Sequence, residues 1–190
     1  MNAVVLDGAR TGDEKVDEVS GAISSALGNL GQVSVFKLRE IPIADCSSCF
    51  SCYIKTPGEC IIDDAARDIA KKLANAHLKV FLTPIVFGGY SSELKKMIDR
   101  QIGAVLPFCD KIQGEVHFLK RYERNGNLVG IGVLPTPDAE SEAIFEALVN
   151  RNAITLHAPA HSTGIIYGED DSSKIQDKIR NILAGVGFKS

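Results

Sequence analysis

The sequence has no tryptophan, only two methionines, and no apolar run near the roughly 20 residues needed to cross a bilayer. It also lacks a basic excess, because 21 Lys and Arg residues face 24 Asp and Glu residues. Nucleic-acid-binding domains usually carry a basic face, so nucleic acid is not expected as a partner. No basic leader precedes the first apolar run. We therefore expect a cytoplasmic protein that does not enter a membrane.

The 190 residues are 45% hydrophobic, enough for a single domain over residues 1–190 with a sizeable core. Apolar runs alternate with segments whose apolar residues recur at helical spacing. The predicted strands are Ala3–Leu6, Val33–Leu38, Leu78–Thr83, Leu128–Leu134 and Ser162–Tyr167. The first predicted helix contains the apolar residues from Val16 to Leu27 and runs to about Leu30. The second runs from Asp63 or Asp64 to about Ala76, and the others are Ser92–Arg100, Ala139–Arg151 and Ser172–Leu183. This alternation predicts an α/β fold with a doubly wound, parallel five-stranded sheet of the flavodoxin-like order.

The dipeptide Asn125-Gly126 is a strong short signal for a β-hairpin. It is flanked by the strand-like segments Glu115–Glu123 and Leu128–Leu134. We therefore predict an extra antiparallel hairpin here, which decorates the edge of the sheet or contributes to a subunit contact.

Three loops are candidates for the functional site. In doubly wound sheets, ligands bind outside the carboxyl ends of the strands, where the strand order reverses. This rule selects Asp7–Asp13, Pro84–Ser91 and Pro135–Ala139. A long cysteine-bearing loop, Arg39–Ile62, is predicted to leave the same edge, and long loops in compact domains are often functional.

Residues 83–100 read TPIVFGGYSSELKKMIDR, and this segment resembles the flavin loop and following helix of the NADPH-dependent FMN reductase family. The resemblance implies that FMN is the cofactor, with Pro84, Ile85, Val86, Phe87 and Gly88 against the isoalloxazine ring. From the residues alone, glycines permit close backbone approach to a flavin, but an ordinary strand-to-helix turn has the same pattern. The family further implies a small-molecule electron donor and acceptor, and a homodimer or homotetramer.

Four of the five cysteines lie within fifteen positions, at Cys46, Cys49, Cys52 and Cys60. This spacing resembles the iron–sulfur flavoprotein branch of the same superfamily, which implies a [4Fe–4S] cluster beside FMN. Closely spaced thiolates of one loop suit such a cluster. A redox-active dithiol, a structural zinc site and a merely pocket-shaping loop stay open as alternatives. Cys109 is predicted to be a packing residue.

The resemblance places the flavin phosphate at the N-terminus of the first helix, where backbone N–H groups and the helix dipole favour anions. Gly8, Arg10 and Gly12 match the expected layout of this loop, and Thr11 is a further candidate for binding the cofactor. The guanidinium of Arg10 is suited to pair with a phosphate.

The same loop departs from the family pattern by placing acidic Asp13 and Glu14 next to the expected dianion. The spacing from Thr11 to Glu14 also fits a capping box, which would consume N–H groups of the helix start. In the third loop, Thr136 is a candidate flavin contact, but Asp138 could simply cap the next helix. Both alternatives stay open.

Three functions follow from these patterns. The leading one is an FMN-dependent oxidoreductase that passes electrons from a reduced donor such as NAD(P)H to a small acceptor such as a quinone. The alternatives are an iron–sulfur flavoprotein that takes electrons from ferredoxin-like donors, and a flavodoxin-like binding module without redox activity. Asp99-Arg100 resembles a family pair whose expected role is an ion pair or an oligomer contact.

Overall fold

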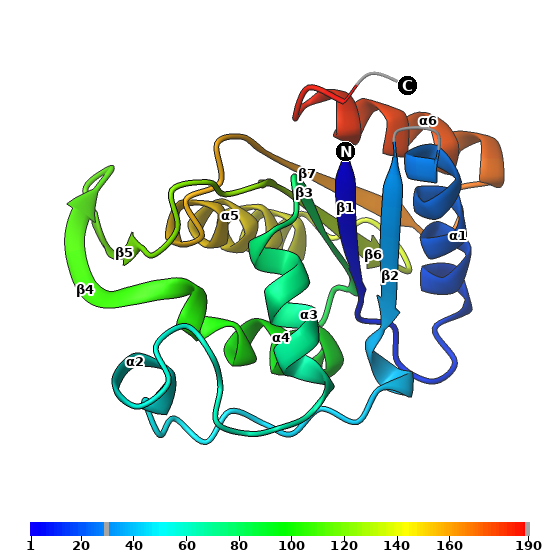
Figure 1. Ribbon diagram of the computed structural model, residues 1–190. Helices are drawn as coiled ribbons and strands as arrows, with labels where there is room; N and C mark the ends of the chain where they lie inside the picture. Colours follow the sequence, from blue (N-terminus) through cyan, green and yellow to red (C-terminus); the bar gives the residue numbers. More distant parts are fainter. Residues whose placement is uncertain (29–30, 189–190) are drawn as a thin grey trace.

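The computed structural model describes residues 1–28 and 31–188 and contains a five-stranded sheet between two layers of helices (Figure 1). The strands are β1 (Asn2–Asp7), β2 (Gln32–Lys37), β3 (Leu78–Pro84), β6 (Asn127–Leu134) and β7 (His161–Tyr167). Their order is β2-β1-β3-β6-β7, and every neighbouring pair is parallel. This is the predicted flavodoxin-like α/β fold.

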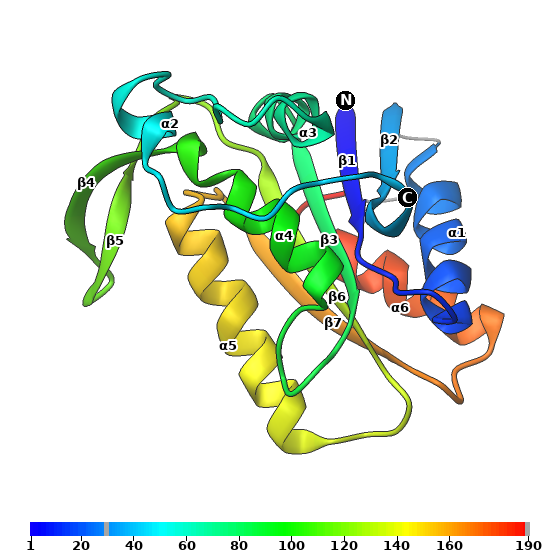
Figure 2. The same cartoon turned by 90° about the horizontal axis from the view of Figure 1, so that it is seen from below.

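Helices cover both faces of the sheet, as Figures 1 and 2 show. They are α1 (Glu14–Gly28), α3 (Ala65–Ala74), α4 (Ser92–Arg100), α5 (Ala139–Thr155) and α6 (Ser172–Ala184). One core cluster joins α1 and α6 to the sheet, and a second joins α3, α4 and α5 to the opposite face. The predicted end of the first helix at Leu30 lies outside the described residues. None of the described helices is both long and apolar enough to cross a membrane.

Sequence signals at the strand and helix ends explain these boundaries. All residues of β3 are buried, as expected for a central parallel strand covered on both faces. Asp64 caps α3 by accepting a hydrogen bond from the Ala66 N–H at 3.0 Å. Ser91 caps α4 in the same way, with its hydroxyl accepting from the Leu94 N–H.

The extra hairpin exists, but its predicted location is wrong. It pairs β4 (Val105–Ile112) with β5 (Glu115–Lys120), and the turn residues Gln113 and Gly114 both have positive φ, of 52° and 88°. The predicted partner, β6, instead pairs in parallel with β3 and β7 because it is buried along almost its whole length. Gly126 instead allows two backbone segments to approach closely, since a Cβ there would lie 2.2 Å from the carbonyl oxygen of Ala76.

Candidate functional site

The strand order reverses between β1 and β3, and the loops that follow these two strands meet there. The Gly8 N–H donates to the Leu82 carbonyl at 2.8 Å, and the Ser91 hydroxyl donates to the Gly8 carbonyl at 2.6 Å. A Cβ at Gly8 would lie only 2.7 Å from the Cβ of Leu94, so a larger residue does not fit. The structure therefore brings together two of the three predicted loops.

The N-terminus of α1 has open hydrogen-bond donors. Within the described residues, the backbone N–H groups of Thr11, Gly12, Glu14 and Lys15 have no hydrogen-bond partner. Gly12 has a φ of +89°, and a Cβ built there would meet no atom within 4 Å. Because unpaired N–H groups and the helix dipole attract anions, this loop fits a flavin phosphate.

The alternative capping box between Thr11 and Glu14 does not form among the described residues. Asp13 directly precedes the helix, and its carboxylate turns back to the Arg10 N–H at 2.8 Å. The Arg10 side chain also bonds this carboxylate, through Nε at 3.1 Å. Burial raises the pKa of Asp13, but the hydrogen bonds from Arg10 outweigh that effect and lower the pKa overall.

The loop after β3 makes a tight turn in which Val86 and Gly89 exchange two backbone hydrogen bonds, of 3.0 and 2.8 Å. Phe87, at the tip, has a φ of +50° and is 98% exposed. Gly88 has a φ of +74°, and a Cβ there would lie 2.6 Å from Ile144. A residue other than glycine at position 88 is therefore excluded both by the conformation and by the neighbouring helix α5.

The third loop joins β6 to α5. The Asp138 carboxylate caps α5 by accepting from the N–H groups of Glu140 at 3.2 Å and Ser141 at 3.4 Å, so the predicted cap is confirmed. Thr136 is exposed, and within the described residues its hydroxyl has no protein partner. This residue is available to a ligand, but its predicted contact with flavin stays a prediction.

The cysteine-bearing loop follows the short 3₁₀ helix η1 (Leu38–Glu40) and contains the single helical turn α2 (Ser51–Ile54). Figure 2 shows it running from the end of β2 past α4 to α2. Burial, and then the charges of Cys60 and Cys46, raise the pKa of Cys52. In the described part of the chain, however, no three Cys, His, Asp or Glu side chains converge closely enough to hold a metal ion.

Arg100 ties the two ends of this loop together. Its guanidinium donates to the carbonyls of Ala44 at 2.7 Å and Ile62 at 3.1 Å, and to both carboxylate oxygens of Asp64 at 2.7 and 2.8 Å. Asp99, in contrast, pairs with Lys95 on the same helix. The expected ion pair of Arg100 is therefore present, with Asp64 as the partner.

The prediction that Cys109 packs in the interior is wrong. Cys109 is exposed on β4, in the hairpin that stands apart from the five-stranded sheet. The apolar neighbours Pro107 and Phe108, which suggested burial, are themselves exposed. Because the hairpin lies outside both core clusters, apolar sequence neighbours do not imply a buried side chain here.

We predict that Cys49 is an unusually reactive thiol in the metal-free protein. Hydrogen bonds from the Ser51 hydroxyl, the Ser51 N–H and the Ser47 hydroxyl lower its pKa to about 7, and the side chain is exposed. Since the thiolate is the nucleophile, its alkylation rate should reach half of its maximum near pH 7. Peptide mass spectrometry after brief iodoacetamide treatment across a pH series measures this midpoint.

Two serine substitutions test the cause of this low midpoint, one beside Cys49 and one elsewhere as the control. Ser51→Ala should raise the midpoint toward the ordinary thiol pKa of about 8.5, because it removes the hydroxyl hydrogen bond, the largest of the effects that lower the pKa of Cys49, while the backbone N–H of residue 51 remains. Ser25→Ala, on the exposed face of α1, should leave it unchanged. A wild-type midpoint already at the ordinary value would contradict the prediction.

Sequence reasoning did not predict the contacts that three side chains make in the site. Ser91 links the two flavin-side loops, Asp13 binds Arg10, and Asp64 anchors Arg100. For Ser91 a signal was available, because a serine directly before an amphipathic helix indicates an N-cap. The partner of Arg100 lies 36 residues away in the sequence and left no local signal.

A doubly wound sheet whose strand order reverses beside a helix start with unpaired N–H groups and a glycine-rich turn is typical of a nucleotide- or flavin-binding α/β protein. A sequence model of the NADPH-dependent FMN reductases matches residues 7–111, more than half of the chain, and the chain belongs to this family. It is accordingly an NAD(P)H-dependent flavin oxidoreductase with FMN as its flavin. No curated protein matches the sequence significantly.

Solved structures share the fold at low sequence identity. The NAD(P)H:quinone oxidoreductase from Methanothermobacter marburgensis superposes with a TM-score of 0.65 at 13% identity, over 97% of this chain and 94% of that one. A putative quinone reductase from Klebsiella pneumoniae gives 0.67 at 14%, over 97% and 83%. The FMN-dependent NADH-azoreductase from Bacillus anthracis, in complex with FMN, gives 0.59 at 10%, over 98% of each chain. At these identities the likeness establishes the fold alone.

Proposed function

We propose that the chain uses FMN to oxidise NAD(P)H and passes the electrons to a small acceptor such as a quinone. The observation that carries this proposal lies at the carboxyl edge of the sheet, where the strand order reverses between β1 and β3. There, unpaired N–H groups at the start of α1 lie beside the Gly8–Ser91 hydrogen bond to the glycine-rich turn. Two structural neighbours are a quinone oxidoreductase and an azoreductase, and their names support a small acceptor of this kind.

In this proposal the phosphate of FMN binds at Gly8, Arg10, Thr11 and Gly12. Backbone N–H groups supply the hydrogen bonds there, because they need no side-chain ordering and add the helix dipole. The ring lies against residues 84–88, and Thr136 approaches it from the third loop.

FMN, when bound, supplies the hydride chemistry, and the chain supplies binding and orientation. The hydrogen bond from the Ile85 N–H to the Val133 carbonyl, at 2.9 Å, fixes the start of the ring loop. The bond from the Ser91 N–H to the Thr83 hydroxyl, at 2.9 Å, fixes its end. The exposed ring of Phe87 then presents an aromatic face to the flavin or its acceptor.

A second candidate function is electron transfer through a [4Fe–4S] cluster. It is favoured by the spacing of Cys46, Cys49, Cys52 and Cys60 and by the electrostatic coupling of the other three to Cys52. The described conformation does not fit a cluster, since no three of these groups converge. The loop would have to close around it. For this reason we place the cluster-free reductase first.

An absorption spectrum with flavin, iron and sulfide analysis, on protein purified without oxygen, tests the proposal. We expect FMN bands, negligible iron, and NADPH oxidation that depends on an added quinone. Cys49→Ser and, as a matched control outside the loop, Cys109→Ser should both keep the flavin bands.

Two other results would each change the conclusion. A broad iron–sulfur absorbance that disappears in Cys49→Ser but persists in Cys109→Ser would establish the second candidate, with electrons taken from a ferredoxin-like donor. A colourless protein that does not take up added FMN would contradict both candidates. The chain would then be a flavodoxin-like binding module.

We also propose that the chain is one domain and forms a homodimer or homotetramer. The two core clusters lie on opposite faces of the same sheet, which supports a single domain. Several large apolar side chains on α2 and the hairpin are exposed, and such a surface suits a subunit contact. They are Phe50, Ile54, Phe108 and Val116.

A further inference from the structure

The Arg10 side chain is bound to Asp13 within the phosphate loop itself. The carboxylate binds Arg10 three times, at the backbone N–H (2.8 Å), Nε (3.1 Å) and Nη2 (3.3 Å). Asp13 is the more buried partner, with 18% of its side chain exposed against 51% for Arg10. Arg10 is thus already paired with an anion that belongs to the chain itself.

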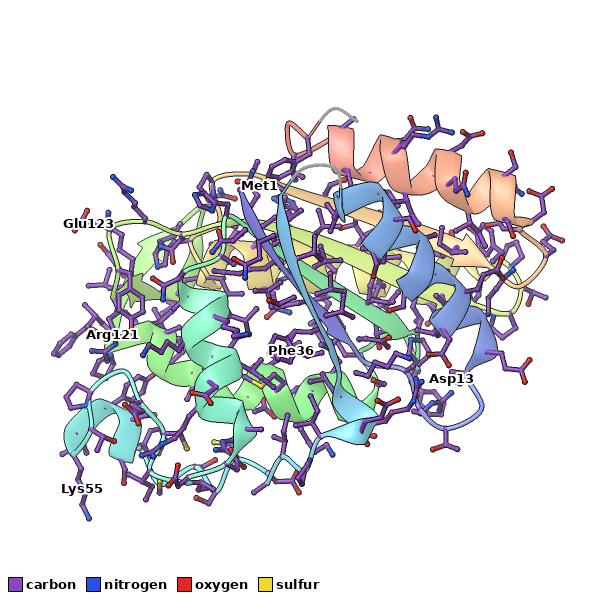
Figure 3. All side chains as sticks on the ribbon, turned by 45° about the vertical axis from the view of Figure 1, so that its right-hand side comes forward. Met1, Asp13, Phe36, Lys55, Arg121 and Glu123 are labelled. Atoms are coloured by element: carbon purple, nitrogen blue, oxygen red, sulfur yellow. The ribbon has the colours of Figure 1, made fainter. Side chains whose placement is uncertain are left out.

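The surroundings add negative rather than positive charge. Asp7 is fully buried at the end of β1, and one of its carboxylate oxygens has no partner among the described residues. Of the other bases nearby, Arg39 is bonded to Asp17 at 2.7 Å and Lys15 to Glu18 at 2.9 Å. Figure 3 shows Asp13 at the start of α1, on the far side of the molecule from Lys55 of the cysteine-bearing loop. An arriving phosphate, with a charge of about −1.5 to −2, therefore meets bases that are already paired.

We infer that Asp13 stands in for the flavin phosphate at Arg10, and that FMN must displace this carboxylate to bind. This inference rests on the proposed function, because it concerns the phosphate end of the same site. A carboxylate and a phosphate compete for the same planar fork of N–H donors. Asp13 consequently weakens the binding of phosphorylated flavin, while riboflavin, which lacks the phosphate, is unaffected. The chain then discriminates little between the two flavins and releases FMN readily.

Flavin titrations of the full chain, stripped of flavin, test this inference by fluorescence quenching. Asp13→Asn removes the charge and keeps the shape, so the Kd for FMN should fall by about tenfold or more. The Kd for riboflavin should stay unchanged. Arg10→Ala should weaken FMN binding more in the Asp13→Asn background than in the wild type, because only there is Arg10 released.

Glu14→Gln is the matched control, since it removes one neighbouring charge from a side chain that does not bind Arg10 within the described residues. Its effect on FMN should be about twofold or less. The inference is overturned if Asp13→Asn leaves FMN binding unchanged or weaker, or if Glu14→Gln tightens it equally. Failure of every variant to bind either flavin would instead overturn the proposed function, and the inference with it.

Discussion

Replacing Arg100 with methionine is expected to lower the free energy of unfolding by about 3 kcal/mol. The guanidinium has no exposed side-chain surface, and Asp64 is only 17% exposed. The substitution would remove the guanidinium from this carboxylate, which keeps only the N–H groups of Ala44 and Ala66, and from the carbonyls of Ala44 and Ile62. An unpaired buried charge costs far more than a lost surface contact. Urea denaturation followed by circular dichroism measures the change.

The matched control is Arg67→Met, because Arg67 lies in the same region but pairs with the exposed side chains of Glu59 and Asp63. Its cost should be about 1 kcal/mol or less. Burial raises the pKa of Asp64, but hydrogen bonds from Arg100 and two N–H groups lower it overall. This stabilisation is present above the unfolded pKa of about 3.9 and is lost as the pH falls below it, so the cost of Arg100→Met should shrink in acid. Equal costs for the two variants would contradict the prediction.

Replacing Lys79 with methionine is expected to stabilise the protein by about 1–3 kcal/mol at neutral pH. Lys79 is the second residue of β3 and is 3% exposed. Its strand neighbours in register are Val4 and Leu128, both in the core. Burial alone lowers its pKa to about 8, and no carboxylate compensates for it within the described residues. A methionine of similar length keeps the packing and removes the buried charge.

The pH dependence identifies the cause. Below pH 8 the lysine is protonated in both states, so the full cost of its burial is present. Between pH 8 and about 10.4 only the unfolded state still holds the proton, so the wild type gains stability as the pH rises. The advantage of Lys79→Met over the wild type should therefore close across this window. Lys37→Met, at an exposed position of β2, should change stability by less than about 0.5 kcal/mol at any of these pH values. A stability difference between Lys79→Met and the wild type that does not change with pH would contradict this explanation.

The central strands and the covering helices were predictable because their patterns are local. β3 is an apolar run interrupted only by Lys79 and Thr83, and Asp64, Ser91 and Asp138 mark helix starts. The hairpin was misplaced because Asn125-Gly126 has the composition of a turn but serves the close approach of two backbones. The actual turn, Gln113-Gly114, carries a weaker signal, and β4 is mostly exposed, so its sequence has little strand periodicity.

The loops of the site were also predictable, because strand order and the carboxyl-edge rule depend only on the alternation of elements. The partners of the charged side chains in these loops were not predictable. The sequence indicated Arg10 as a phosphate ligand, whereas the structure shows the same side chain bound to Asp13. Arg10 and Asp13 are three positions apart, and either partner of Arg10, the Asp13 carboxylate or a phosphate, satisfies the local chemistry.

The sequence by itself determined the fold, the family and the edge of the sheet that we propose as the flavin site, because hydrophobic periodicity and short motifs act over a few neighbouring residues. Only the tertiary structure decided which partners the charged side chains take. Arg100 binds Asp64, 36 positions away, and Ser91 joins the loop after β3 to Gly8. Within the described residues, the thiols of the cysteine-bearing loop do not converge on a metal site. Such contacts depend on how distant segments are placed by packing, and no local pattern encodes that placement.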